Sequence, residues 1–297
     1  MLPLYRQIKQ RFLQSHMTDS EASATALMLI EEVTGHSRTQ ILTADFLETD
    51  TDKLLSLADQ IANGTPIQYA LGYTYFCGMK FQVNPHVLIP RPETEELVEW
   101  IYSSFSLLPS SPSTLLDIGT GSGCIAISLA KKLPQIQVTA LDISSEALQI
   151  AQRNAQSPTV DVAFLQLDIL SETPPGTYAC IVSNPPYVCE SEALQMESNV
   201  LDHEPHLALF VPDATPLLFY ETIARKALHL LTPNGYLFFE INRQYGSAIT
   251  TLLHDLGYTD VQLRQDQFGN DRMIRAKMVK SRPPLTPPLW GERNSKW

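Results

Sequence analysis

Residues 115–123 read Leu-Leu-Asp-Ile-Gly-Thr-Gly-Ser-Gly, and a helical pattern follows from Cys124 to Lys132. The apolar run before the glycines is typical of a buried strand. Glycines at alternate positions let the chain turn tightly and let a ligand approach the backbone without a Cβ in the way. A strand, a glycine-rich turn and a helix in this order indicate the first unit of a ligand-binding α/β sheet.

From this unit onward, short apolar segments alternate with amphipathic segments, which predicts a doubly wound α/β sheet. The last two segments have no helix between them, so we expect an antiparallel pair that closes the sheet. The further strand-like segments are 136–141, 162–167, 180–183, 236–241, 259–264 and 272–277, with a helix over 145–156.

The first 64 residues have a helical pattern, with a capping-box match at Thr18 and Glu21. A hairpin with its turn at Gly78 follows, and a new helix is predicted to begin at Pro92. We therefore expect four parts. They are a small helical domain (1–72), a β-hairpin linker (73–91), an α/β domain (92–280) and a flexible proline-rich tail (281–297).

Composition bounds the class of protein. The chain has 297 residues, 44% of them hydrophobic, with no run of 18 apolar residues and no signal-peptide core. We expect no membrane span and a cytoplasmic location. The four cysteines lack CxxC spacing, which favours reduced, mostly buried thiols and no metal site. The formal net charge of −11 disfavours nucleic acid as the main partner.

Acidic residues close the second and third strand segments. Asp142 lies nineteen positions after Gly123, where a carboxylate can reach ribose hydroxyls, and Asp168 could meet an adenine amino group. The dinucleotide pattern G-x-G-x-x-G is not met, because Gly123 comes one residue early. Each feature alone can be explained as a turn or a helix cap. Together, and in this order, they predict an adenosyl ligand.

Residues 183–187 read Ser-Asn-Pro-Pro-Tyr and follow the apolar run 178–182. A strand would therefore deliver Asn184 to the edge of the sheet where α/β proteins bind ligands. Its side-chain oxygen and a neighbouring carbonyl could accept the two protons of an NH2 group and position that nitrogen for reaction. The alternative is a rigid turn that only uses proline.

These segments resemble the class I S-adenosylmethionine-dependent methyltransferases and, among them, the release-factor glutamine methyltransferases. The similarity extends from about Leu4 to Lys277 and implies a seven-stranded sheet, mostly parallel with an antiparallel C-terminal strand. The Arg-Pro-Glu-Thr-Glu block is the most specific. The blocks in family order are Pro66–Tyr69 with Leu71-Gly72, Val87–Glu95, Leu116–Ala126, Ile181–Tyr187 and Glu204-Pro205.

The resemblance implies methyl transfer to the side-chain amide nitrogen (N5) of the glutamine in the Gly-Gly-Gln motif of class 1 peptide-chain release factors. S-adenosylmethionine would be the donor and S-adenosylhomocysteine the product. The helical domain would recognise the release factor, and we expect a monomer that binds no nucleic acid directly. The alternative is a DNA or RNA amino-group methyltransferase that uses the same Asn-Pro-Pro-Tyr site.

The resemblance also implies roles for individual residues. Asn184 and the Pro185 carbonyl would accept the amide protons, and Tyr187 would pack against the amide. These three are the expected catalytic residues, and no metal ligand is expected. The expected substrate-binding residues are Asn184, Pro185, Pro186, Tyr187, Arg91 and Glu93. The expected cofactor-binding residues are Asp117, Gly119, Thr120, Gly121, Ser122, Gly123, Asp142, Ile143, Asp168, Ile169 and Asn184.

Three departures from the family pattern concern loops. The segment 210–215 lacks paired glycines, Asn242 stands where glycine is usual, and Gln265-Asp266 replaces a frequent Lys-Asp pair. None of them is expected to contact the chemical residues. Two other classes also remain open, a cofactor-binding interaction module without catalysis and a nucleotide-dependent oxidoreductase.

Overall fold

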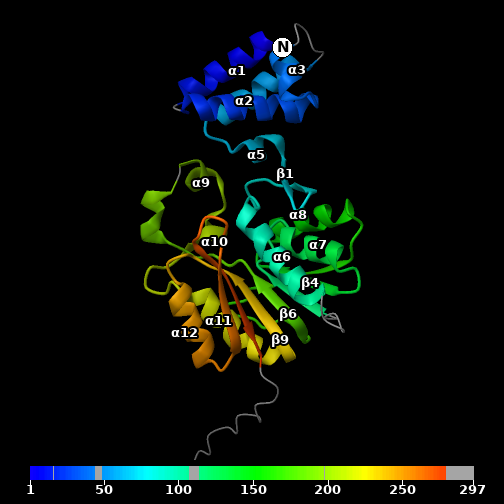
Figure 1. Cartoon of the computed structure of the whole chain (residues 1–297), viewed down its shortest axis with the longest axis vertical. Coiled ribbons are helices and arrows are strands. Elements are labelled where there is room, and N and C mark those ends of the chain that lie inside the picture. Colours follow the sequence, from blue (N-terminus) through cyan, green and yellow to red (C-terminus); the bar gives the residue numbers. More distant parts are fainter. Residues whose placement is uncertain (16, 44–48, 107–113, 197, 279–297) are drawn as a thin grey trace, which may run out of the picture.

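The computed structural model describes residues 1–15, 17–43, 49–106, 114–196 and 198–278. Four helices form one end of the molecule, and a sheet flanked by helices forms the other (Figure 1). The tail predicted over 281–297 lies outside the described residues.

The amino-terminal helices have a core of their own. They are α1 (Leu2–Gln14), α2 (Asp19–Thr34), α3 (Arg38–Thr43) and α4 (Thr51–Ala62). Ile8, Phe12 and Leu29 are fully buried between them. The predicted capping box at the start of α2 is confirmed, since Thr18 and Glu21 bond reciprocally. Burial of aliphatic and aromatic side chains on one face of each helix stabilises this group.

A short helix and a hairpin connect the two ends. They are α5 (Ile67–Leu71), β1 (Tyr73–Phe76) and β2 (Met79–Gln82), with the turn at Cys77 and Gly78. The Tyr73 hydroxyl donates to Glu32 of α2 over 2.7 Å. At the other end, the buried Asn154 side chain bonds both the N–H and the C=O of Gln82, at 2.7 and 3.0 Å, and also donates to the Ser122 carbonyl over 2.9 Å.

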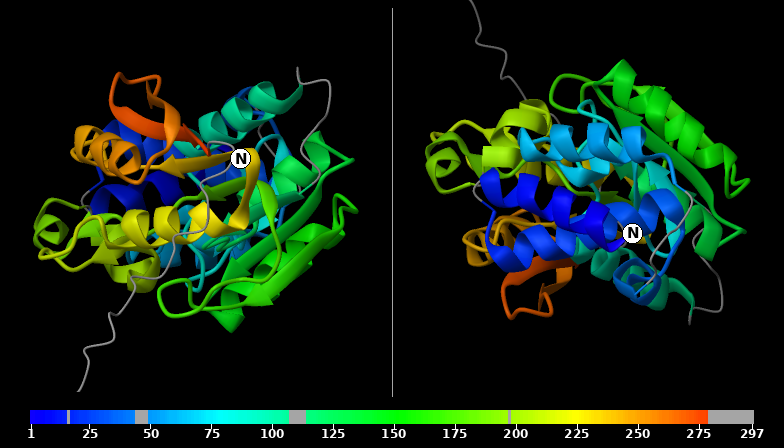
Figure 2. Two further views of the ribbon diagram at one scale, coloured as in Figure 1. Left: turned by 90° about the horizontal axis from the view of Figure 1, so that it is seen from below. Right: turned by 90° about the horizontal axis from the view of Figure 1, so that it is seen from above.

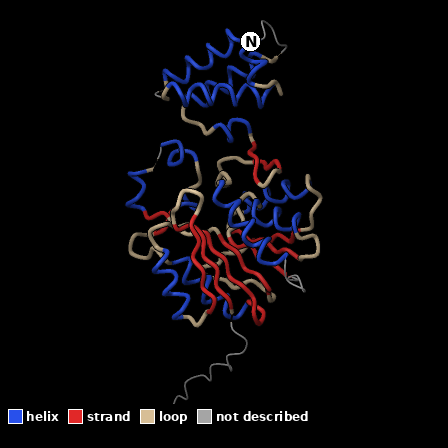
Figure 3. Tube along the Cα trace, viewed as in Figure 1, coloured by secondary structure: helices blue, strands red, loops and turns tan. Residues whose placement is uncertain are grey.

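The sheet has seven strands in the order β10-β11-β9-β6-β3-β4-β5. Figure 3 draws the strands of the molecule in red. Within the sheet only β11 runs antiparallel to its neighbours, so the expected fold class is confirmed. The strands are β3 (Thr114–Ile118), β4 (Gln137–Asp142), β5 (Val162–Gln166), β6 (Tyr178–Ser183), β9 (Leu231–Glu240), β10 (Thr259–Gln265) and β11 (Asp271–Lys277).

Helices cover both faces of the sheet (Figure 2). One face packs against α6 (Pro92–Ser106), α7 (Cys124–Lys132) and α8 (Ser145–Gln156). The other face packs against α11 (Leu218–Leu230) and α12 (Gly246–Asp255). Because both faces are buried, the central strands are almost continuously apolar. The parallel strands end on the side of the sheet that faces the amino-terminal helices (Figure 1).

The segment from 188 to 209 contains short regular elements. They are β7 (Val188–Cys189), the 3-10 helix η1 (Glu190–Gln195), α9 (Ser198–His203) and α10 (His206–Leu209). β7 pairs with β8 (Phe210–Val211), which returns the chain to the sheet. This local pairing satisfies backbone groups that a loop would leave open. In the described part of the chain, no helix has the length and apolar character needed to cross a membrane.

Candidate active site

Two adjoining cavities lie at the carboxyl ends of the parallel strands. The larger has a volume of about 310 Å³ and the smaller about 200 Å³. Five residues line both cavities, namely Leu88, Arg91, Asn184, Pro185 and Ala208. The two spaces therefore meet at the Asn-Pro-Pro-Tyr turn that follows β6.

The glycine loop after β3 forms one wall of the larger cavity. Gly119 (φ 73°) and Gly121 (φ 55°) are in the left-handed region, and a Cβ added to either would meet no atom within 4 Å. Gly123 has a different role, because a Cβ there would lie 2.8 Å from Ile127 and 3.1 Å from Ala151. It permits close packing of α7 against α8 and does not line either cavity.

Asp117 supports this loop from below. Its carboxylate accepts from the Thr120 hydroxyl at 2.6 Å and from the Ala126 N–H at 3.2 Å. Its other oxygen has no partner among the described residues. Burial raises the pKa of Asp117 to about 7, although these two hydrogen bonds oppose the shift. The residue fixes the shape of the loop without lining the cavity.

Asp142 and Ile143 form the next part of the wall, at the end of β4. The Asp142 carboxylate accepts from the Gly121 N–H at 2.8 Å and from the Ser144 N–H at 3.0 Å. Burial raises its pKa, against the effect of these backbone donors. A carboxylate has about four lone-pair sites, so these backbone bonds still leave one available to a ligand in the cavity. Ile143 is 45% exposed and offers an apolar surface there.

Asp168 and Ile169 follow β5 and also line the larger cavity. The Asp168 carboxylate bonds the Leu170 N–H and the Ser171 hydroxyl within its own turn. Lys226 of α11 holds this turn from behind, because its ammonium donates to the carbonyls of Ile169, at 2.6 Å, and Glu172. No local pattern in the sequence points to Lys226, because it lies 57 positions from Ile169.

The turn after β6 presents acceptors to both cavities. Asn184, Pro185 and Pro186 line the larger cavity, whereas Tyr187 lines the smaller. Among the described residues, no donor is bonded to the Asn184 Oδ1 or to the Pro185 carbonyl. The Ser183 hydroxyl donates to the Ile118 carbonyl at 2.7 Å and so ties the turn to the neighbouring strand.

A buried carboxylate behind Asn184 was not foreseen from the sequence. Glu240, at the end of β9, is 1% exposed and accepts from the Thr94 hydroxyl at 2.6 Å and the Tyr187 hydroxyl at 3.3 Å. The Asn184 Nδ2 lies 3.4 Å from the Thr94 Oγ1. Burial raises the pKa of Glu240 and also that of Tyr187. Strand-end position was the only signal for Glu240.

The Arg-Pro-Glu-Thr-Glu block contributes unequally. Arg91 lines both cavities and pairs with Glu204, whose side chain is 1% exposed, at 2.5 Å. The second Glu204 oxygen accepts from the Ile89 N–H at 3.2 Å. Glu93, expected to bind substrate, lines neither cavity. Its charge contributes to the raised pKa of Glu240.

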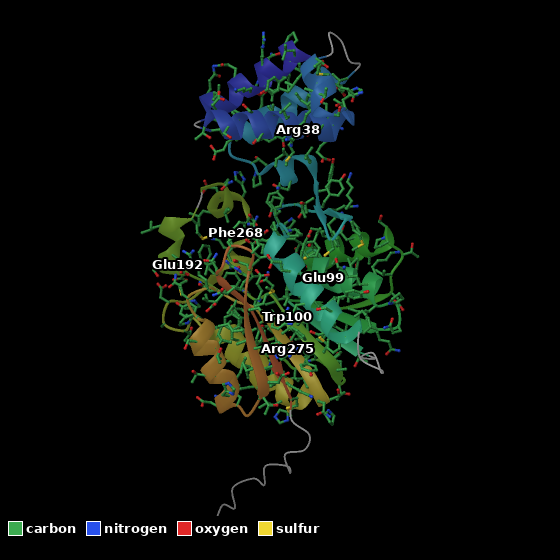
Figure 4. The ribbon with its side chains drawn as sticks, in the orientation of Figure 1. Arg38, Glu99, Trp100, Glu192, Phe268 and Arg275 are labelled. Carbon is green, nitrogen blue, oxygen red and sulfur yellow. The ribbon has the colours of Figure 1, made fainter. Side chains whose placement is uncertain are left out.

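The expectation that the departures avoid the chemical residues is wrong for Asn242. Its side-chain amide donates to the Tyr187 carbonyl and to Glu192 of η1, both at 3.2 Å. Glu192 lies on the flank of the molecule near α9 (Figure 4). A glycine could not make these bonds, so this chain fixes Tyr187 in a way that a glycine at this position would not allow. The sequence could not show this, because Asn242 and Tyr187 are 55 positions apart.

Comparison with known proteins supports one family. The family model "Methyltransferase small domain" matches residues 104–204. A release factor glutamine methyltransferase of Flavobacterium psychrophilum is 43% identical over 91% of this chain and 97% of its own length. One of Bacteroides thetaiotaomicron is 50% identical over 75% of this chain and 80% of its own.

A solved structure, the release-factor-specific protein-(glutamine-N5) methyltransferase of Alicyclobacillus acidocaldarius, is 27% identical over 67% of this chain and all of its own, with a TM-score of 0.40. The family assignment rests on the sequence relatives, of which the Flavobacterium enzyme aligns with 91% of this chain. The chain belongs to the release factor glutamine methyltransferase family.

Proposed function

We propose that this chain transfers a methyl group from S-adenosylmethionine to the side-chain amide nitrogen (N5) of the glutamine in the Gly-Gly-Gln motif of class 1 release factors. The observation that carries this proposal is the meeting of two cavities at Asn184 and Pro185. The larger cavity fits an adenosyl ligand, and the smaller one admits a side chain to two unbonded acceptors.

The larger cavity suits this cofactor in three places. The bare backbone of Gly119 and Gly121 leaves room for the methionyl part, because a Cβ at either glycine would point into open space. The remaining lone pair of Asp142 can accept from a ribose hydroxyl. Ile143 and Ile169 offer apolar surfaces for the adenine, and Asp168 can accept from its amino group. When bound, the cofactor supplies a methyl group already activated by a sulfonium charge.

The smaller cavity suits a glutamine side chain. An amide nitrogen is a poor nucleophile because its lone pair is delocalised over the carbonyl. Asn184 Oδ1 and the Pro185 carbonyl would each accept one amide proton, which fixes the nitrogen and favours its pyramidal form. Tyr187 would pack against the flat amide. This alignment needs no covalent nucleophile, and Arg91 would hold the loop that closes both cavities.

The domain division supports docking of a large protein substrate. We assign 1–72 to release-factor recognition, 73–91 to the linker and 92–280 to catalysis, with 188–209 completing the docking surface. The amino-terminal helices face the strand ends that carry the cavities (Figure 1). Leu194 of η1 is 95% exposed and offers an apolar contact on the segment 188–209. The chain would act as a cytoplasmic monomer, without direct nucleic-acid binding.

One experiment tests the reaction. The full chain is incubated with labelled cofactor and purified release factor, and mass spectrometry locates the methyl group. We expect it on the glutamine of Gly-Gly-Gln, and no label on a factor in which that glutamine is replaced. DNA and ribosomal RNA are tested in parallel as substrates. Label on either nucleic acid, with none on the release factor, would overturn the proposal.

A second experiment tests docking. Leu194→Glu should raise KM for the intact release factor and leave KM unchanged for a short peptide that contains Gly-Gly-Gln. The peptide controls for damage to the cavities, because it reaches the same site without the docking surface. Equal changes for both substrates would contradict the assignment of 188–209 to docking.

A further inference from the structure

Three residues from separate elements converge behind the Asn184 amide, and the catalytic roles given above use only Tyr187 among them. Glu240 ends β9, Thr94 lies in the first turn of α6, and Tyr187 closes the turn after β6. Glu240 and Thr94 are 1% and 2% exposed. Their contacts span more than 50 positions along the chain, so only the fold brings them together.

The direction of these hydrogen bonds follows from the chemistry of the groups. An ionised carboxylate carries no proton, so Glu240 accepts from both Thr94 and Tyr187. A threonine hydroxyl has one proton, and Thr94 commits it to Glu240. The Thr94 oxygen can then only accept, and the partner that it faces at 3.4 Å is the Asn184 Nδ2.

This order fixes which end of the Asn184 amide faces the smaller cavity. The NH2 group points back to Thr94, and Oδ1 is left without a donor among the described residues. We propose that Glu240, acting through Thr94, is a positioning residue that keeps the Asn184 oxygen directed at the substrate nitrogen. The inference rests on the proposed function, because it assumes that Oδ1 accepts a proton of the substrate amide.

A reversed amide would block the reaction. If the group at position 240 donates instead of accepting, Thr94 is free to donate to the Asn184 oxygen, and the amide turns by half a rotation. Its NH2 group would then face the NH2 group of the substrate, and two donors repel each other. The reversal changes the direction of two hydrogen bonds, between position 240 and Thr94 and between Thr94 and Asn184, and almost no packing, which separates an orienting role from a purely structural one.

The groups that face Glu240 determine how its protonation, and through it kcat, depends on pH. Thr94, Tyr187 and Arg272 favour its ionised form, whereas Glu93 and burial favour the protonated form. Arg272 is held by Asp266 over 3.2 Å. Protonation of Glu240 at acidic pH supplies a donor and should reverse the amide, so kcat should fall as pH falls.

The first test uses the isosteric variant Glu240→Gln, whose NH2 can donate to Thr94. We expect kcat on release factor to fall at least tenfold, with cofactor Kd within twofold and thermal unfolding within a few degrees. The acid limb of the pH–kcat profile should disappear in this variant. Unchanged kcat, or an equal loss of cofactor affinity, would overturn the proposal.

A second pair of variants covers the case in which Glu240→Gln fails to fold. Thr94→Ser keeps the hydroxyl and should retain kcat within threefold, whereas Thr94→Val removes it and should lose kcat as Glu240→Gln does. Valine and threonine have nearly the same shape, so packing is matched. Equal losses in Thr94→Ser and Thr94→Val would overturn the proposal.

A readout independent of activity separates this proposal from the proposed function. In protein labelled with ¹⁵N asparagine, the side-chain NH2 signal of Asn184 is assigned by its loss in Asn184→Ala. We expect slow exchange with solvent in the wild-type chain and faster exchange with a shifted signal in Glu240→Gln. An identical signal in both would overturn the orientation, whichever substrate the enzyme methylates.

Discussion

The two cavities are built in different ways. Part of the wall of the larger one is bare backbone, at Gly119 and Gly121 of the glycine loop, and the residues at the ends of β4 and β5 also line it. The described residues that line the smaller one include no glycine, and they come from segments near residues 88–91, 184–188, 196–200, 208–209 and 240. A backbone wall tolerates most substitutions except those that add a Cβ, whereas a side-chain wall depends on each residue that forms it.

The largest expected effect is at Asn184, where the two cavities meet. Asn184→Ala should reduce kcat on release factor by roughly 10²–10³-fold, the usual cost of removing one preorganised hydrogen-bonding group from an active site. Cofactor Kd should stay within about threefold, because the glycine loop is untouched. Titration calorimetry measures the affinity. Equal losses of kcat and of cofactor affinity would show that the two cavities do not act separately.

The next effect concerns the glycine loop that lines the larger cavity. Gly121→Val places a β-branched side chain at φ 55° on the cavity wall and should weaken cofactor binding by about tenfold or more. Gly72→Val is the matched control, because Gly72 has φ 80°, open space around its Cβ position and no place on either wall. If both variants weaken the cofactor equally, general strain explains the loss.

A third prediction concerns Asp117, a buried acid beneath the glycine loop. Because burial raises the pKa of Asp117 from 3.8 to about 7, the folded chain holds a proton that the unfolded chain has released between these values. Stability should therefore fall as pH rises through this window, by up to about 1.4 kcal/mol per pH unit. Asp117→Asn cannot titrate and should flatten the curve measured by urea unfolding. An unchanged slope would contradict this assignment.

The smallest expected effect concerns the turn behind the adenine surface. Lys226→Met removes the donor to the carbonyls of Ile169 and Glu172 and should raise cofactor Kd about threefold. Lys131→Met is the control, since Lys131 also donates to a carbonyl, that of Pro158, but away from the cavities. Equal effects would show that Lys226 has no special part in cofactor binding.

The same contrast explains what could be predicted from the sequence. The glycine loop, Asp142 and the turn at Asn184 follow directly from strand ends, which local apolar patterns locate. The seven-stranded fold was predicted correctly for the same reason. Glu240 and Lys226 have no local pattern of their own, because their partners lie 53 to 146 positions away. Thr94 lies in the Arg-Pro-Glu-Thr-Glu block, but its bond to Glu240 has no signal in that block. Glu93 was chosen for its neighbourhood in the sequence, yet its side chain lines neither cavity.

The buried Asn154 has a mechanical consequence. Its side-chain oxygen accepts from the N–H of Gln82 in β2. Its NH2 group donates to the carbonyls of Gln82 and Ser122. These bonds fix the β1–β2 hairpin, which connects to the amino-terminal helices, to the glycine loop after β3. A change in the angle between the hairpin and the glycine loop would require breaking these bonds. We therefore expect protein docking on the amino-terminal helices to be coupled to the geometry of the proposed cofactor site through Asn154, together with the bond from the Cys77 N–H to Glu95.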